Sequence, residues 1–201
     1  MTSQRLLALG LTVLLASAGT SCGTKSSDCT LTSWAQTTTG KEVPLNDGVK
    51  VFDSLAQSFK VTASDSAATA SVVSVGLSLL RTGDFPLGTT LTATINADST
   101  GSPSATALGT ATVGMANVST TASVATFVFP TALTLTTGTP YWIVLKGSYG
   151  NSSTTYVKWL GYSDAVNYPD GQAKEHIQSA TSWSSSDYGD QEDQVFFVNK
   201  C

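Results

Sequence analysis

Apolar and hydroxyl-bearing residues alternate along much of this chain, and this alternation restricts it to β-structure. Side chains on a strand point to opposite faces with a period of two, whereas an amphipathic helix repeats every 3.6 residues. No persuasive helical stripe is present after the N-terminal segment. The residues predicted to point inward are Leu91, Ala93, Ile95 and Ala97 in one segment and Val73, Val75, Leu77 and Leu79 in another. The pattern predicts half-buried strands with a hydroxyl-rich outer face.

Further short strands are predicted at regular intervals. They cover residues 57–62, 108–113, 124–129, 141–146, 155–160 and 194–199, and turn-forming residues separate them at 83–84, 97–103, 137–140 and 169–171. Many short strands without helical crossovers indicate two antiparallel sheets packed face to face. The fold class predicted is therefore all-β, a single-domain antiparallel β-sandwich with a jelly-roll-like order, similar in build to galactose-binding and carbohydrate-binding modules.

The charge composition argues against a nucleic-acid partner. Charged residues make up 12% of the chain, which carries ten Lys and Arg and a net charge of −4. Binding to phosphate backbones requires a basic patch, and these cations are scattered. An acidic chain is likewise not attracted to anionic lipid headgroups. Any contact with a membrane is therefore expected through a covalent lipid only.

The N-terminus has the features of an export signal. Arg5 precedes an apolar run over residues 6–16, which is shorter than the ~20 residues that span a bilayer. Two cleavage sites compete. Cleavage after Ala18 would give a soluble secreted protein, whereas cleavage before Cys22 resembles a lipobox, although Gly19 stands where leucine is usual. Cleavage before Cys22 predicts a signal peptide over 1–21, a lipid-anchored tether over 22–28, and a lipoprotein of the outer membrane or cell surface.

The odd number of cysteines bears on this choice. The chain has three, and export places them in a compartment where disulfides form. If Cys22 carries lipid, Cys29 and Cys201 remain as a pair at the two ends of the predicted domain, 29–201. A bridge closing so long a loop would contribute roughly 5 kcal/mol in the chain-entropy model. The alternative is a bridge between Cys22 and Cys29 that leaves Cys201 free.

Several segments resemble the choice-of-anchor R type of β-sandwich domain found in bacterial surface and secreted proteins. The resemblance covers roughly residues 50–198. It rests on 56–59 (AQSF), 95–103 (INADSTGSP), 108–109 (LG), 135–145 (LTTGTPYWIVL), 159–162 (WLGY), 171–173 (GQA) and 182–184 (SWS). It implies a sandwich fold and brings no catalytic residues with it.

Few residues are suited to catalysis or metal binding. The one histidine, His176, follows Glu175, and no serine lies in a nucleophile-elbow sequence. We therefore predict no enzyme, with a hydrolase using these two residues ranked last, and a polar position on a late strand or hairpin for His176. Asp187, Asp190 and Asp193 recur every third residue and offer oxygen ligands for a structural Ca²⁺, but a solvated acidic loop explains them equally well.

Aromatic residues gather in the last third of the chain. Trp159, Tyr162, Tyr168 and Trp183 are interleaved with Gly, Asn and Asp, as in sites where a ring stacks on a sugar. The alternative is that these rings close one end of the core. The leading hypothesis is a non-catalytic surface lipoprotein that binds a glycan or a surface protein. The competing hypothesis is a structural or assembly subunit of the cell envelope or an extracellular coat, which pairs through strand edges.

Overall fold

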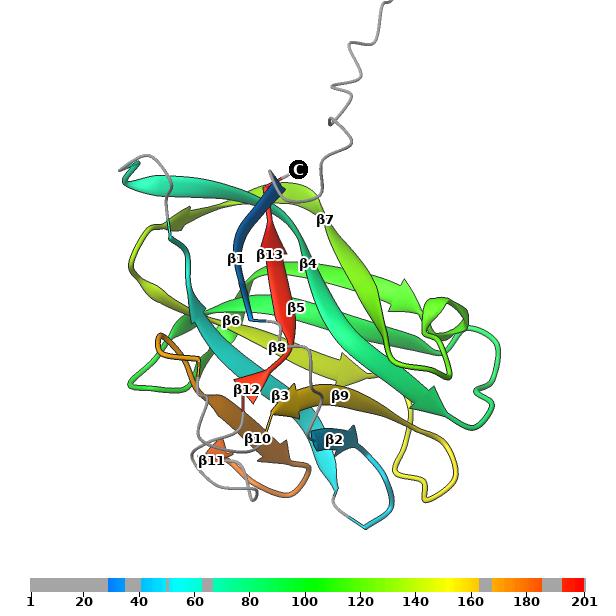
Figure 1. The fold of residues 1–201 in the computed structure, drawn as a ribbon. Coiled ribbons are helices and arrows are strands. Elements are labelled where there is room, and N and C mark those ends of the chain that lie inside the picture. Colours follow the sequence, from blue (N-terminus) through cyan, green and yellow to red (C-terminus); the bar gives the residue numbers. More distant parts are fainter. Residues whose placement is uncertain are drawn as a thin grey trace, which may run out of the picture.

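Two antiparallel β-sheets make up the part of the chain that the computed structural model describes, residues 29–34, 41–49, 51–62, 67–162, 168–185 and 193–200. The seven-stranded sheet contains β1 (Thr30–Trp34), β2 (Lys41–Leu45), β4 (Thr69–Thr82), β7 (Ser123–Thr136), β9 (Tyr156–Tyr162), β12 (Asp193–Gln194) and β13 (Phe196–Asn199). The six-stranded sheet contains β3 (Phe52–Lys60), β5 (Thr90–Asp98), β6 (Pro103–Gly114), β8 (Pro140–Gly147), β10 (Ala173–Ile177) and β11 (Ser184–Ser185). A 3-10 turn, η1 (Met115–Asn117), follows β6. The predicted all-β sandwich is confirmed (Figure 1).

The strand pairing is that of a hairpin rolled up on itself. β5 pairs with β6, β4 with β7 and β3 with β8, so that each pair encloses the previous one in sequence. The pairing of β5 with β8 then joins the innermost and outermost pairs in one sheet. Nested antiparallel pairs of this kind are those of a jelly roll, the order predicted from many short strands without helical crossovers.

A bulge corrects the predicted register of β4. Leu91, Ala93 and Ile95 of β5 are buried as the alternation requires, and so are Val75, Leu77 and Leu79 of β4. The prediction is wrong for Ala97, which is only half-buried, because the register with β6 shifts after Ile95. Val73, however, is only half-buried, and Val72 takes the inward position in its place. The reason is an irregularity between Val72 and Ser74, opposite the segment of β7 that contains Pro130. The additional residues are in β7, where the four residues 129–132 face Val73 alone, and such an irregularity changes which side chains of the two strands point inward.

The first and last described strands lie side by side, as expected for the two ends of the domain. β1 pairs with β13, and the backbone N–H of Lys200 donates to the carbonyl of Cys29 at 2.7 Å. Cys22 and Cys201 lie outside the described residues. The predicted bridge between Cys29 and Cys201 therefore remains a prediction. The main-chain hydrogen bond brings Cys29 to Lys200, the residue that precedes Cys201.

Four loops meet at the end of the sandwich opposite this pair, and we refer to it as the distal end. They are residues 46–49, 83–89, 115–122 and 147–155, and Figure 1 shows them away from the C label, toward the right and the bottom of the view. Backbone hydrogen bonds join them: Ser152 to Asn46, Ser148 to Thr90, Met115 to Thr89 and Arg81 to Ser119. The distal end is therefore a connected surface.

Candidate functional site

The predicted aromatic cluster does not form an exposed platform. Trp159 is 0% exposed and belongs to the core, where its Nε1 donates to the carbonyl of Val195 at 2.9 Å. Tyr168 is 6% exposed and packs edge-on against Phe196. Trp183 is half-buried. The side chain of Tyr162 lies outside the described part. For Trp159 and Tyr168 the alternative interpretation, rings that fill the core, is the correct one.

One interpretation of the acidic repeat placed its aspartates on a solvated loop. Asp193 is not on such a loop. It is 2% exposed, and its two carboxylate oxygens accept hydrogen bonds from Gln57 Nε2 at 2.8 Å and from the backbone N–H of Tyr168 at 2.6 Å. Burial, the largest effect, raises the pKa of this carboxyl, and the two hydrogen bonds oppose the rise. Asp187 and Asp190 lie outside the described residues. Within the described ranges, no three His, Cys, Asp or Glu side chains are grouped as a metal site would need.

His176 lies on β10, as predicted for a polar position on a late strand. Its Nδ1 is 2.8 Å from Asp53 Oδ1, and its ring meets the Trp183 ring edge-on at a centroid distance of 5.3 Å. No hydrogen bond joins this ring to a serine hydroxyl in the part of the chain that is described. Glu175, beside it in sequence, is 2% exposed. The described contacts hold His176 in place on the sheet.

A cavity of about 260 Å³ opens at the distal end, between the loop over residues 83–89 and the turn that contains η1. Arg81 connects its walls. The Arg81 Nε donates to the carbonyl of Val118 at 2.9 Å, and the guanidinium also donates to the carbonyl of Gly83 at 2.6 Å. Gly83 has a φ of +75°, and a Cβ there would lie 2.3 Å from the carbonyl oxygen of Thr154. Glycine is therefore required where the loop leaves β4.

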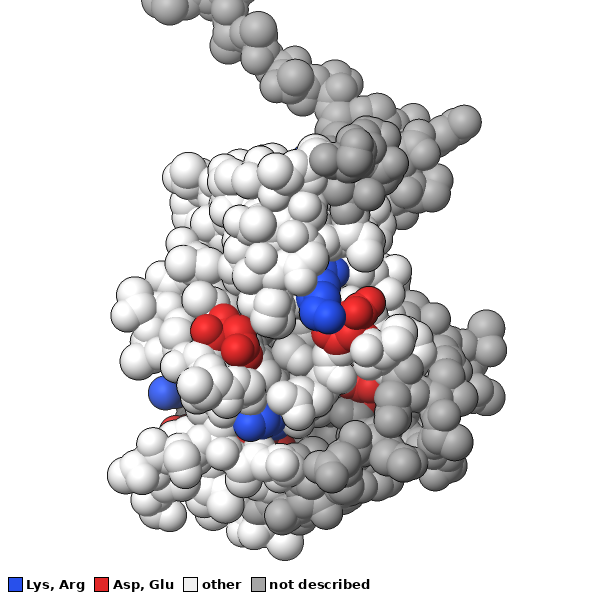
Figure 2. All heavy atoms as spheres, turned by 90° about the vertical axis from the view of Figure 1, so that its left-hand side faces the viewer, with Lys and Arg blue, Asp and Glu red and all other residues white. Residues whose placement is uncertain are grey.

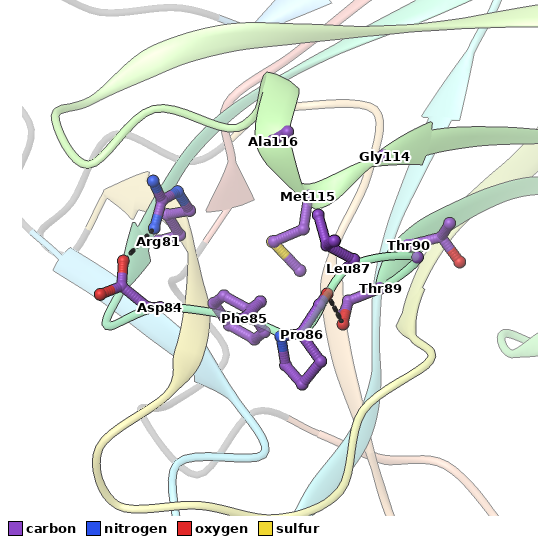
Figure 3. A pocket seen from close by; sticks show the side chains of 11 residues that line it. Arg81, Asp84, Phe85, Pro86, Leu87, Thr89, Thr90, Gly114, Met115 and Ala116 are labelled. Atoms are coloured by element: carbon purple, nitrogen blue, oxygen red, sulfur yellow. Dashed lines mark hydrogen bonds and ion pairs between the residues drawn. The ribbon is translucent and has the colours of Figure 1, made fainter.

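The cavity combines a charged side with an apolar side. Figure 3 shows Arg81 and Asp84 at one side and Met115, Phe85, Pro86 and Leu87 across from them. The Asp84 carboxylate is 3.6 Å from the guanidinium and fully exposed, so it is open to a ligand. An exposed ion pair of this kind is weak in water, so both charged groups can exchange it for hydrogen bonds to the polar groups of a ligand. The cavity is near the lower limit of ligand-pocket volumes.

The loop over residues 83–89 is a ridge between this cavity and a second, more open depression. The depression, of about 550 Å³, is lined on its far side by residues 148–151 and Thr155. Phe85 supports the ridge by meeting the Tyr149 ring edge-on at 5.0 Å. Leu87, near the crest, is fully exposed. An apolar side chain held in water on a supported loop is available for contact with a ligand.

Tyr149 fixes the base of the depression. Its hydroxyl donates to the carbonyl of Leu45 at 3.2 Å and accepts the backbone N–H of Val157 at 3.1 Å. Burial, the largest effect, raises the pKa of this hydroxyl well above its ordinary value, so the phenol stays protonated. The Tyr149 ring is therefore a structural support and not a proton donor to a ligand.

Charged groups are few on the face of the molecule that Figure 2 shows. A small number of acidic and basic groups, some of them in contact, lie there among uncharged residues. Exposed pairs such as Lys60 with Asp170, at 3.2 Å, contribute little to stability. The distal cavity, with Arg81 and Asp84 beside an apolar wall, therefore differs from the surface shown there.

Sequence reasoning missed the distal site. It identified Gly83 and Asp84 only as turn residues, although the same loop continues with Phe85, Pro86 and Leu87. A solvent-exposed connection has no need of two large apolar side chains. Their presence between Gly83 and Gly88 was the signal that could have pointed to this loop.

Comparisons of the chain with protein-family models, with curated protein sequences and with solved structures give no significant match. The resemblance to choice-of-anchor R domains thus stays a prediction. Within the described ranges, no helix has the length and apolar character needed to cross a bilayer.

Proposed function

We propose that the protein is an exported, non-catalytic binding module that meets its ligand, a glycan or another surface component, with the cavity at its distal end. The observation that carries the proposal is the placement of this cavity. β1 and β13 bring the ends of the domain together, and the two loops that line the cavity, 83–89 and the turn that contains η1, lie at the opposite end. A module tethered through residues 22–28 would present this end away from the attachment point.

The chemistry of the cavity favours a sugar among small ligands. A pyranose ring has an apolar face and a rim of hydroxyl groups, so it needs an apolar wall beside hydrogen-bonding groups. Phe85, Leu87 and Met115 supply the wall. Arg81 supplies donors and the exposed Asp84 carboxylate supplies acceptors. Hydrogen bonds to charged groups are stronger than those between neutral groups.

Substitution of two exposed residues tests this site. We expect Asp84→Ala and Leu87→Ala, combined, to weaken binding to a glycan array or a polysaccharide pull-down at least about tenfold, because a hydrogen bond to a charged group contributes about 1.5–3 kcal/mol and about 1.4 kcal/mol is tenfold. Both side chains are exposed, so the fold should be retained. Val49→Ala is the matched control, since Val49 is an exposed apolar loop residue that does not line the cavity.

The control defines how the experiment is interpreted. Loss of binding in the double variant with retention in Val49→Ala supports the distal site. Equal binding by all three proteins would place the ligand elsewhere on the surface. A protein that binds no glycan or surface polysaccharide would contradict the proposed ligand class.

We further propose that cleavage occurs before Cys22, that Cys22 carries lipid, and that Cys29 and Cys201 form a disulfide. The main-chain bond between Cys29 and Lys200 supports the pairing, because it brings Cys201's neighbour within hydrogen-bond distance of Cys29. Intact mass spectrometry of membrane-extracted protein should give a chain that starts at residue 22 with added acyl mass, and reduction should add one hydrogen per bridged sulfur. A chain that starts near Gly19 without acyl mass, or a mass unchanged by reduction, would refute the corresponding part.

A further inference from the structure

The depression beyond the ridge is lined by polar side chains that carry no charge. These side chains are those of Thr89, Ser148, Asn151 and Thr155, beside the ring of Tyr149. Among the described residues that line it there is no Asp, Glu, Lys, Arg or His. Neutral hydroxyl and amide groups bind a neutral partner without the cost of removing a charge from water. The depression is therefore suited to an uncharged ligand that is rich in hydroxyl groups.

Asn151 presents its amide nitrogen to this depression in a fixed orientation. Its Oδ1 accepts the backbone N–H of Gly48 at 2.6 Å, and a backbone N–H can only donate, so the oxygen must face Gly48. Within the described part of the chain, the exposed Nδ2 makes no hydrogen bond. Its N–H groups are available to a ligand, and a donor that is already oriented loses little freedom on binding.

The hydroxyl groups of Ser148 and Thr89 complement this donor. Ser148 Oγ accepts the backbone N–H of Thr90 at 2.8 Å and the hydroxyl of Thr90 at 3.2 Å. Both of its lone pairs are then used, and its own O–H is left to donate. Thr89 Oγ1 donates to the carbonyl of Pro86 at 2.7 Å, so its lone pairs are left to accept. The depression thus offers both donors and acceptors, as the hydroxyl groups of a sugar require.

The depression and the cavity share one wall. Residues 85–89 line both of them, so a ligand that leaves the cavity reaches the depression by crossing a single loop. The cavity alone, at about 260 Å³, is smaller than the usual ligand pocket of about 300–1,000 Å³. A ligand of ordinary size therefore extends beyond it. The ridge, with the exposed Leu87 near its crest, can be contacted from both sides by one extended molecule.

We propose that the depression is a second subsite, which takes a neutral sugar unit of the same chain whose neighbouring unit lies in the cavity. The ligand is then a linear oligosaccharide or polysaccharide that crosses the ridge, and not a single sugar. This inference rests on the proposed function, because the cavity is the first subsite. A chain held in the cavity reaches the depression without a second loss of translational freedom, so affinity should rise with chain length until both subsites are filled.

Chain length tests the number of subsites. The probes are oligomers of glucose, galactose, mannose, xylose and N-acetylglucosamine, each of one to six units, on a glycan array and then in calorimetry. The protein, purified with its own leader processed, should bind the longer oligomers of its preferred sugar at least about fivefold more tightly than the single unit. Two further hydrogen bonds of ordinary strength account for a gain of this size.

Asn151→Asp tests the depression itself. The new carboxylate can still accept the N–H of Gly48, so the substitution removes the donor and keeps the loop contact. It should weaken oligomer binding at least about threefold and leave the binding of a single unit unchanged. Asn117→Asp is the matched control, the same change in an exposed distal residue that lines neither the cavity nor the depression. Asp84→Ala alters the cavity alone and should weaken single units and oligomers alike.

The outcomes separate this inference from the proposed function. Binding that depends on Asp84 but neither on chain length nor on Asn151 would overturn the second subsite and leave the proposed function intact. An equal loss in Asn151→Asp and Asn117→Asp would be an effect of the added charge and would also overturn the second subsite. A protein that binds none of these sugars at any length would contradict both proposals.

Discussion

Trp159→Ala is expected to lower the free energy of unfolding by about 3–5 kcal/mol, the usual cost of removing a large core aromatic. Trp159 lies opposite Leu79 of β4 and Val43 of β2, where the two strands flank β9. Its Nε1 also satisfies the carbonyl of Val195. In thermal unfolding followed by circular dichroism, the midpoint should fall by roughly 6–20 °C for a domain of this size.

Trp183→Ala is the matched control for this prediction. Trp183 is half-buried, and its described ring contact is the edge-on one with His176. Its loss should cost about 1 kcal/mol or less, in the range of partly exposed substitutions. A Trp159→Ala protein as stable as the Trp183→Ala protein would contradict the core position of Trp159. Loss of ligand binding in Trp159→Ala alone would therefore reflect unfolding.

The strands of the sandwich were predictable where local pattern and tertiary packing agree. Leu91, Ala93 and Ile95 alternate in sequence and are all buried, because β5 pairs regularly along that stretch with β8 and β6. The alternation wrongly predicted that Val73 points inward. A bulge depends on the partner strand, so the sequence around Val73 does not indicate it. β2 was missed because Pro44 interrupts its pattern, and an edge strand tolerates that proline.

The candidate site was less predictable, because closeness in sequence does not determine exposure. Trp159 and Trp183 both belong to the aromatic residues of the last third of the chain, yet the first is in the centre of a sheet and the second near β11 at an edge. The distal cavity instead joins loops far apart in the chain, such as those of Phe85 and Met115. Only the strand order brings these loops together.

Asp193→Ala is expected to destabilise the protein by about 1–3 kcal/mol at pH 7. The substitution removes the acceptor of the Tyr168 backbone N–H and one of the two acceptors of Gln57 Nε2, which also donates to the carbonyl of Ser58 at 3.1 Å. A buried donor without an acceptor costs about 1–3 kcal/mol, and removal of a buried charge offsets part of the loss. Asp170→Ala is the control, because Asp170 is a partly exposed carboxylate whose ion pair with Lys60 contributes about 1 kcal/mol or less. Urea unfolding of the three proteins measures the differences.

The loss caused by Asp193→Ala should also depend on pH, with a sign that follows from the raised pKa. The folded protein holds a proton on Asp193 more readily than the unfolded chain, whose carboxyl has an ordinary pKa of 3.8. The folded state therefore binds more protons over the interval between the two pKa values, and stability falls as the pH rises through it. The difference between the unmodified protein and the variant should be larger near pH 4 than at pH 7. A difference that grows with pH would show that the hydrogen bonds from Gln57 and Tyr168 outweigh burial and lower this pKa.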